Sequence, residues 1–331
     1  MDEPINNAAY EPLISIIIPV YHVEPYIEKC LNSVLTQSYS NYEAIIVNDG
    51  GTSIERDICR AYCDKDPRFL LIDTENRGIS STRNTGLDRA HGKIIVFLDS
   101  DDYLLQNHLM SIVSTFSETS ADIVQFDFYV TDESGSYTLR INSDISYGLH
   151  SSKEMILSLA TGKMWPNLWA RAFRVSVFED IRFPDGELWE DAAILHELFF
   201  KAENVYYINQ ANYYYLQRST GITKCDPLNP SRWRFIQYRK RYDFISSKYP
   251  ESVHNADISL IRTGIGYGKW CVLTHRVKEY DEMRAWFLSK QMYTKGLPVL
   301  LKAAFWILIH CKPVFPVLVK VYELFKRMKT R

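Results

Sequence analysis

Residues Ile94–Leu105 have the sequence IIVFLDSDDYLL, and this segment decides the fold. An apolar, β-branched run ends abruptly in Asp99, Ser100, Asp101 and Asp102. Open α/β sheets bind ligands at the carboxyl ends of their strands, so we expect these side chains to line a binding crevice. Mg²⁺ and Mn²⁺ prefer oxygen ligands, commonly one or two carboxylates together with substrate phosphates. The pattern predicts a metal-bound nucleotide diphosphate; the alternative is a solvated acidic turn that opens the next helix.

The composition is that of an ordinary globular protein, and it gives no general case for nucleic-acid binding. The chain has 331 residues, of which 46% are hydrophobic and 24% charged, with a formal net charge of −2. Its six cysteines are scattered without a C-x-x-C pair, which suits a reducing cytoplasm. We interpret Cys59 and Cys63 as small apolar residues of a core rather than as metal ligands. The first residues, MDEPINNAAYEP, do not resemble a signal peptide, so we expect a cytoplasmic location.

The first part of the chain alternates short apolar segments with helical periodicity. Ile14–Val20 is a predicted buried strand, and Pro25 suits the first turn of the helix that follows. The alternation continues to about Tyr129 and implies βαβ crossovers in a mostly parallel sheet, with helices on both faces. Further strands are expected at Ala44–Val47, Phe69–Ile72 and Ile94–Leu98, and helices at Ile54–Cys63 and Ser80–Ala90.

The second part differs in composition. Residues 164–223 are aromatic and show no regular β/α alternation, whereas residues 230–295 have mainly helical patterns. We predict an α/β domain followed by a helical C-terminal region. The predicted parts are a nucleotide-binding half at 1–130 and an acceptor-side half at 131–225, which together form a domain at 1–225, and the helical region at 226–331.

The C-terminal segment combines apolar, aromatic and basic residues. Its sequence is GLPVLLKAAFWILIHCKPVFPVLVKVYELFKRMKTR, and lysines and prolines interrupt the apolar runs before they reach the roughly 20 residues that span a bilayer. This pattern favours a helix lying in an anionic membrane interface, at the inner face of the cell membrane. The alternative is a helix packed in the core. The basic tail consists of Lys326, Arg327, Lys329 and Arg331.

Polar side chains also follow the other predicted strands. Pro19 and Tyr21 end the first strand, Asp49 ends the second, and Arg83 lies in the segment after the third. Asp49 is suited to accept an N–H of a pyrimidine base; the alternative is a turn residue beside two glycines. Arg83 is suited to bind diphosphate oxygens; the alternative is a solvated charge on a helix. Parallel strands end at one edge of a sheet, so these groups are expected to converge.

Three segments, in this order, resemble the nucleotide-binding half of glycosyltransferase family 2: SIIIPVYHVEPYIEKCLNSVLTQSYSNYEAIIVNDG, NRGISSTRNTGL and GKIIVFLDSDDYL. The resemblance implies a GT-A fold with a Rossmann-like sheet, and a UDP-sugar donor. It also implies that Asp49 contacts uracil, that Arg83 lies near the nucleotide, and that Asp99 and Asp101 address ribose, diphosphate and a Mn²⁺ or Mg²⁺ ion. Asp101 is our first choice as metal ligand, with Asp99 closer to the nucleotide.

One loop departs from the family's pattern. The family commonly has D-G-S-T-D after the second strand, whereas this chain has Asp49-Gly50-Gly51-Thr52-Ser53. A serine hydroxyl and a carboxylate are therefore missing, and the base and ribose contacts stay open. We predict that Ser53 supplies the N-cap oxygen of the following helix.

The resemblance continues through an acidic pair that follows an F-P-x-G segment. The corresponding residues are Glu190 and Asp191, and the family implies that Asp191 is the base that deprotonates the acceptor hydroxyl. Glu190 is expected to bind the acceptor or to orient its neighbour. The alternative is an acidic first helical turn, which the helix dipole favours.

An aromatic strand and a polar loop, Tyr213–Thr220, resemble the family's segment near the diphosphate. Arg218 in this loop is a candidate contact for the leaving group, and the alternative is a surface charge. Tryptophans at 165, 169 and 189 could stack on sugars or serve as packing residues. Arg171 stands where the family often has lysine, and its role is open. The expected donor contacts are Pro19, Tyr21, Asp49, Arg83, Asp99, Ser100 and Arg218.

The sequence thus predicts an inverting, metal-dependent glycosyltransferase that moves a hexosyl or N-acetylhexosaminyl group from a UDP-sugar to a glycan or lipid-linked acceptor in surface or capsular polysaccharide synthesis. One alternative is a nucleotidyltransferase, but a Gly-rich phosphate loop is missing from PVYHVEPYIE after the first strand. Another is a catalytically silent, membrane-associated partner that binds nucleotide, which the altered Gly51 and Ser53 would suit.

Overall fold

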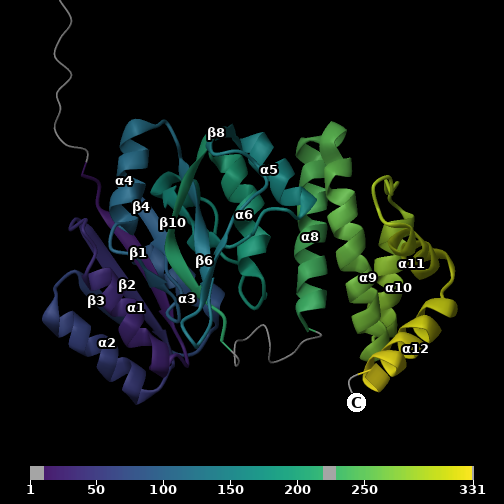
Figure 1. Ribbon diagram of the computed structural model, residues 1–331, viewed down its shortest axis with the longest axis horizontal. Coiled ribbons are helices and arrows are strands. Elements are labelled where there is room, and N and C mark those ends of the chain that lie inside the picture. Colours follow the sequence, from purple (N-terminus) through teal and green to yellow (C-terminus); the bar gives the residue numbers. More distant parts are fainter. Residues whose placement is uncertain (1–10, 219–228, 330–331) are drawn as a thin grey trace, which may run out of the picture. The chain divides into compact units, whose positions relative to one another are not determined.

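The structure is a computed structural model that describes residues 11–218 and 229–329, and it contains a mixed sheet and a set of later helices (Figure 1). The strands are β1 (Ile14–Val20), β2 (Tyr42–Asp49), β3 (Phe69–Thr74), β4 (Ile94–Phe97), β5 (Tyr103–Leu104), β6 (Ile123–Thr131), β7 (Tyr137–Arg140), β8 (Gly148–Ser151), β9 (Arg171–Arg174) and β10 (Asn204–Leu216). The helices up to β10 are α1 (Glu24–Leu35), α2 (Ser53–Lys65), α3 (Ile79–Arg89), α4 (His108–Glu118), α5 (Ser152–Thr161) and α6 (Glu190–Lys201), with short 3₁₀ turns η1 (Leu168–Ala170) and η2 (Val175–Phe178). The later helices are α8 (Asn229–Lys248), α9 (Asp257–Leu273), α10 (Val277–Leu288), α11 (Val299–His310) and α12 (Val314–Lys329), with η3 at Pro250–Ala256.

The predicted α/β architecture is confirmed in the first part of the chain. Strands β3, β2, β1 and β4 lie side by side in this order and are parallel. Their carboxyl ends therefore share one edge of the sheet. Strand β1 is buried along its whole length, as expected for a central parallel strand with a continuous apolar sequence.

The second part, for which the sequence showed no regular β/α alternation, adds mainly antiparallel pairs to the sheet. Strand β9 is inserted between β4 and β6 and is antiparallel to both, with Ala172 opposite Val96 on one side and Val124 on the other. Strand β10 is parallel to β6, while β5, β7 and β8 add antiparallel pairs. Pairing between segments so distant in sequence leaves no local periodicity that would reveal it.

Close packing of α3 on the sheet positions Arg83. A Cβ atom at Gly86 would lie 2.4 Å from Cγ2 of Ile17 in β1, so this glycine lets helix and strand approach. Arg83 lies one turn earlier on the same helix and is only 2% exposed. The packing thus holds a charged side chain inside the protein, next to the ends of the parallel strands.

The described residues form two compact units, one with residues 11–156 and 164–218 and the other with residues 157–163 and 229–329. In the second unit, helix α9 is packed closely by its neighbours. A Cβ at Gly264 would lie 2.5 Å from the ring of Phe287, and one at Gly268 would lie 2.7 Å from Leu308. These two glycines let α10 and α11 approach the helix.

No helix within residues 11–218 and 229–329 has the length and apolar character needed to cross a membrane.

Cys59 is fully buried, and burial raises the pKa of its thiol to about 12. Some predicted features lie outside the described residues, namely Cys225, Ser219, Thr220, Arg331 and the side chains of Lys326, Arg327 and Lys329.

Candidate active site

The acidic segment after β4 lies at the carboxyl edge of the sheet, where the sequence predicted it. Strand β4 ends at Phe97, and the N–H of Asp102 donates to the carbonyl of Asp99 across a tight turn at 2.9 Å. Ser100 in this turn is buried. The side chains of Asp99 and Asp101 are 27% and 18% exposed, so both keep access to solvent.

Asp102 has a structural role within the protein. Its side chain is buried and accepts a 2.6 Å hydrogen bond from the Tyr213 hydroxyl and a 2.7 Å bond from the N–H of Leu216. Both donors belong to β10. Asp102 therefore anchors the acidic turn to this strand and leaves Asp99 and Asp101 as the more accessible carboxylates.

Arg83 joins the acidic turn to the start of α6. Its Nη2 lies 2.8 Å from Oδ1 of Asp99, and its Nη1 lies 2.5 Å from both Oε1 of Glu190 and Oδ1 of Asp191. Burial disfavours the charged guanidinium, but the three carboxylates outweigh burial and raise its pKa. One buried cation thus brings together residues that the sequence assigned to donor and acceptor.

The acidic pair occupies the first turn of α6. Asp191 accepts a second hydrogen bond, from the N–H of Leu168, at 3.1 Å. Burial raises the pKa of Glu190 to about 7; Arg83 opposes the shift and Asp191 adds to it. Trp189, just before the helix, has a φ of 62°, a left-handed conformation that is strained for a bulky residue. The structure therefore holds this helix start in a costly geometry that fixes both carboxylates.

Arg218 contacts the other metal candidate. Its Nε lies 2.7 Å from Oδ2 of Asp101, and its guanidinium lies over the ring of Tyr26, 5.4 Å from the centroid. Arg218 thus lies beside the acidic turn, and its contact with a leaving group stays a prediction.

The carboxylate oxygens at this edge of the sheet are suitable ligands for a hard divalent cation. Four carboxylates share two guanidinium groups, so these ion pairs leave an excess of negative charge. Burial and the nearby Asp99 raise the pKa of Asp101 to about 6, against the effect of Arg218. The pKa values of neighbouring carboxylates rise in this way when there is too little positive charge near them. The carboxylates are Asp99, Asp101, Glu190 and Asp191, and the guanidinium groups are Arg83 and Arg218.

The predicted base-binding residues lie at the ends of β1 and β2. Asp49 is buried and accepts hydrogen bonds from the N–H groups of Arg77 and Gly78, at 2.8 and 2.9 Å. It therefore fixes the loop that leads into α3. Pro19 is buried within β1, whereas Tyr21 is 41% exposed beyond its end. Contacts of these residues with a nucleotide stay predictions.

The loop that departs from the family's pattern is built around Glu55, which the sequence analysis did not single out. The prediction that Ser53 caps α2 is wrong, because the N-cap is Thr52. The Thr52 hydroxyl accepts from the N–H of Glu55, whose Oε2 accepts from the N–H of Thr52 at 2.8 Å. A Cβ at Gly51 would lie 2.3 Å from that oxygen, so glycine makes room for the carboxylate. The T-x-x-E spacing is the sequence signal that was missed.

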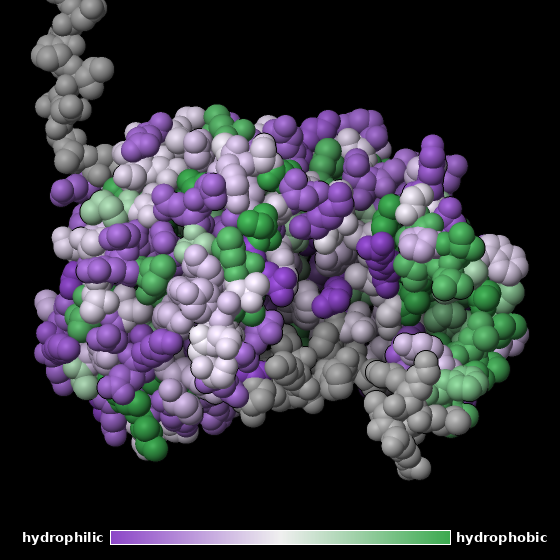
Figure 2. Space-filling model, viewed as in Figure 1, coloured by the Kyte–Doolittle hydropathy of each residue, from purple (hydrophilic) through white to green (hydrophobic). Residues whose placement is uncertain are grey.

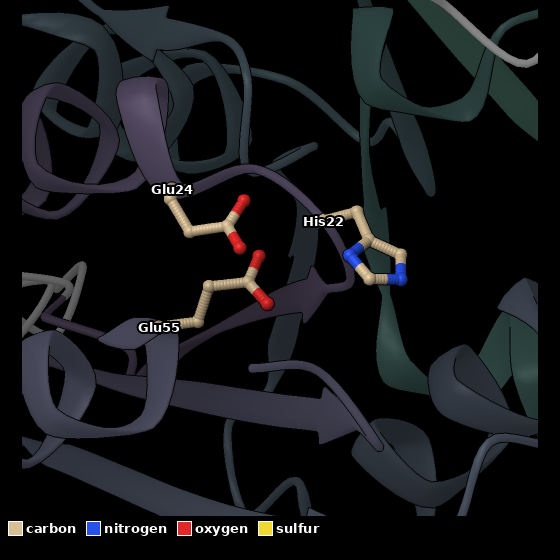
Figure 3. A group of neighbouring side chains, drawn as sticks. All are labelled: His22, Glu24 and Glu55. Carbon is tan, nitrogen blue, oxygen red and sulfur yellow. The ribbon is translucent and has the colours of Figure 1, made fainter. Parts of the chain in front are cut away.

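Within the described residues, one group of three potential metal ligands lies close together, and it consists of His22, Glu24 and Glu55 (Figure 3). The two carboxylates face each other between the first turns of α1 and α2. The oxygens of Glu55 accept from the N–H groups of Val23 and Thr52, and Glu24 accepts from the Thr52 hydroxyl at 2.9 Å. Helix capping explains this cluster, and we assign no metal to it.

Two of the tryptophans considered for stacking on sugars, Trp165 and Trp169, differ in exposure. Trp169 stacks on Tyr213 and Tyr215, with centroids 4.5 and 5.2 Å apart, and is therefore a packing residue. Trp165 is 40% exposed.

Arg171 is buried and donates to the carbonyl groups of Asn167 and Trp165, at 2.5 and 3.0 Å. Burial lowers its pKa to about 9. Arg171 thus holds the segment that precedes η1.

Comparisons with known proteins agree with this architecture. The family model described as Glycosyl transferase family 2 matches residues 15–182. Glycosyltransferase GlyA of Streptococcus pneumoniae serotype 4 is 34% identical over 223 residues, which are 64% of this chain and 31% of GlyA. The match therefore spans about a third of that relative.

Solved glycosyltransferase structures confirm the predicted GT-A fold. S. aureus TarS 1-349 in complex with UDP-GlcNAc has a TM-score of 0.65 at 18% identity, covering 96% of this chain and 92% of that one. The mannosyltransferase PcManGT from Pyrobaculum calidifontis, in complex with GDP-Man and Mn²⁺, has a TM-score of 0.53 at 15% identity, covering 96% and 88%. At these identities the likeness concerns the fold alone.

Proposed function

This chain belongs to glycosyltransferase family 2, and we propose that it transfers a hexosyl or N-acetylhexosaminyl group from a UDP-sugar to an acceptor hydroxyl, with inversion at the anomeric carbon. The observation that carries the proposal is the position of Arg83. This buried guanidinium contacts a strand-end aspartate and both carboxylates of the α6 start. One cation thus brings a donor-side carboxylate close to a candidate base, which supports direct transfer between a donor and an acceptor that are bound next to each other.

On the donor side, Asp101 and Asp99 would hold a Mn²⁺ or Mg²⁺ ion. The excess of negative charge at this edge supports the assignment. When bound, the ion neutralises charge on the diphosphate as the sugar bond breaks. Arg218 lies beside Asp101 and supplies a further positive charge for the leaving group.

On the acceptor side, Asp191 removes the proton of the attacking hydroxyl. Its carboxylate is held by Arg83 Nη1 and the N–H of Leu168, which fix its orientation before the acceptor binds. Glu190 shares the same Nη1 atom and orients the acceptor or its neighbour. Arg83 acts as a positioning residue, because its two Nη atoms contact these carboxylates and Asp99.

The acceptor is a glycan or a lipid-linked glycan in surface or capsular polysaccharide synthesis, and the protein works as a peripheral protein at the cytoplasmic face of the membrane. The interleaved apolar and basic residues after Gly296 support the membrane contact. Trp165, which is 40% exposed, is available for stacking on a sugar ring.

A donor screen tests the proposed function. The protein is incubated with Mn²⁺, a mixture of glycan acceptors and single nucleotide sugars, and release of the nucleoside diphosphate is measured. We expect release from UDP-sugars and the inverted linkage in the product. Preference for another nucleotide would overturn the UDP assignment. UDP binding without turnover of any donor would favour the catalytically silent partner.

A further inference from the structure

Helices α11 and α12 expose a continuous set of large apolar side chains. Figure 2 shows this surface as a green patch over the yellow helices of Figure 1. Leu300 is 83% exposed and Val299 79%, among the highest values for apolar residues of the protein. We call this set the apolar face. It consists of Val299, Leu300, Trp306, Val314, Val317, Leu318, Val321, Tyr322, Leu324 and Phe325.

The exposure is not a sign of loosely attached helices. Leu308 of α11 is fully buried, and Phe315 and Val319 of α12 are 5% and 7% exposed. Leu308 and Phe315 are both near neighbours of Gly268 in α9. One side of each helix therefore belongs to the core of the helical unit. A helix on the surface of a globular protein normally has a polar outer side, whereas these helices remain apolar there.

The segment that carries the apolar face has mainly cationic charged residues, of which Lys312 pairs with Asp281 of α10 at 2.7 Å. Residues 295–331 contain eight lysines or arginines and one acidic residue, Glu323. Glu323 is only 21% exposed and lies 2.5 Å from Lys269, which neutralises it. Lys302 and Lys320 are exposed on the two helices. The surface is thus apolar and positively charged, which complements an anionic lipid headgroup layer.

A cavity of about 550 Å³ opens beside α11, and its walls are largely apolar. Phe305, Trp306 and Ile309 contribute to it, and its basic groups are those of Lys290, Lys302 and His310. Trp306 and Lys302 belong to both the cavity and the surface described above. An apolar hollow with cations and no carboxylate in its lining fits one acyl chain below an anionic headgroup.

We propose that the apolar face docks on an anionic phospholipid bilayer, with α11 and α12 lying in the headgroup region and the cavity taking one acyl chain. This rests on the membrane contact of the proposed function and deepens it by naming the docking surface and a cavity for one acyl chain. A second copy of the chain fits less well, because it would bring like charges together. Helix α12 has 16 residues, too few to span a bilayer, so the contact is interfacial.

Vesicle flotation tests the proposal with the full chain and vesicles of phosphatidylcholine, with or without phosphatidylglycerol. We expect flotation with phosphatidylglycerol and weaker flotation without it. The double variant Leu300→Glu and Val317→Glu should reduce the partition coefficient at least about tenfold, because it places charge on apolar contacts. Leu139→Glu, at a side chain that is 48% exposed on β7, is the matched control and should float normally.

A second variant tests the electrostatic contribution of the lysines to lipid binding. Lys302→Gln with Lys320→Gln should weaken binding to phosphatidylglycerol vesicles by about fivefold per lysine and leave binding to pure phosphatidylcholine unchanged. Unchanged flotation of the glutamate variant, no flotation of the wild type, or dimers by light scattering that the glutamate variant abolishes would each overturn the proposal. UDP binding by calorimetry is measured on the same samples, so a failed vesicle experiment is distinguishable from a failed donor site.

Discussion

The acidic edge of the sheet and the apolar face of α11 and α12 depart from ordinary burial in opposite directions. At the edge, Arg83 is 2% exposed yet charged, and carboxylates compensate it. On the apolar face, Leu300 is 83% exposed although it is apolar. Each departure costs free energy in isolation, so each points to something the protein binds. The buried charges suit a small charged ligand, and the exposed apolar surface suits an extended partner.

Removal of the metal should have the largest effect, and it should act on the acidic edge alone. We expect Asp101→Ala, or EDTA, to abolish transfer, because the diphosphate charge is then uncompensated as the sugar bond breaks. Product formation is the measurement. Asp88→Ala, at an exposed carboxylate that pairs with Arg182, is the control and should retain activity. Full activity in EDTA would contradict the metal assignment.

Arg83→Met tests the acidic edge by removing the cation that contacts Asp99, Glu190 and Asp191. It leaves three half-buried carboxylates without their shared cation, so we expect a loss of up to about 3 kcal/mol in the free energy of unfolding, the lower end of the range for a fully buried pair. Urea denaturation followed by fluorescence measures it. Arg56→Met removes a guanidinium from an exposed ion pair with Asp73 and should cost less than about 1 kcal/mol. Equal losses in the two variants would mean that the Arg83 contacts contribute little.

The sequence predicted the donor half well because its signals are local. The alternation from Ile14 to Leu98 predicted the four parallel strands, and the abrupt end of β4 placed Asp99 and Asp101 at the sheet edge. The antiparallel insertion of β9 was not predicted, because its pairing with β4 joins residues far apart in the chain.

The site residues were easier to identify than their partners. The sequence singled out Arg83, Glu190 and Asp191. It did not show that the guanidinium of Arg83 contacts both acidic residues. Such contacts depend on how α3 and α6 approach each other, which spacing along the chain does not encode. The cap at Thr52 was missed for a different reason, since the T-x-x-E pattern was present in the sequence.

A smaller effect is expected from two glycines of α9, which test how closely α10 packs against α9 in the helical unit. Gly264→Ala places a methyl group against the buried ring of Phe287, so we expect a loss of about 1–3 kcal/mol in stability. Gly266→Ala meets only the Ser231 hydroxyl, at 3.8 Å, and should gain about 0.5–1 kcal/mol. Denaturant unfolding measures both, and a gain for Gly264→Ala would contradict the close packing.

The central claim is that one edge of the sheet serves the donor while Asp191 serves the acceptor, and Asp191→Asn separates these roles most directly. The asparagine keeps the size of the side chain and removes the proton acceptor. Glu190→Gln is the matched control, because it changes the charge of a carboxylate on the same Arg83 Nη1 atom.

Calorimetry with UDP and product formation with the full substrates are measured on each variant. For Asp191→Asn we expect nearly unchanged UDP affinity and a transfer rate lower by about two to four orders of magnitude, with a smaller loss of rate for Glu190→Gln. Near-normal turnover of Asp191→Asn would remove this residue from the mechanism. Loss of UDP binding together with activity would contradict the separation of donor and acceptor roles.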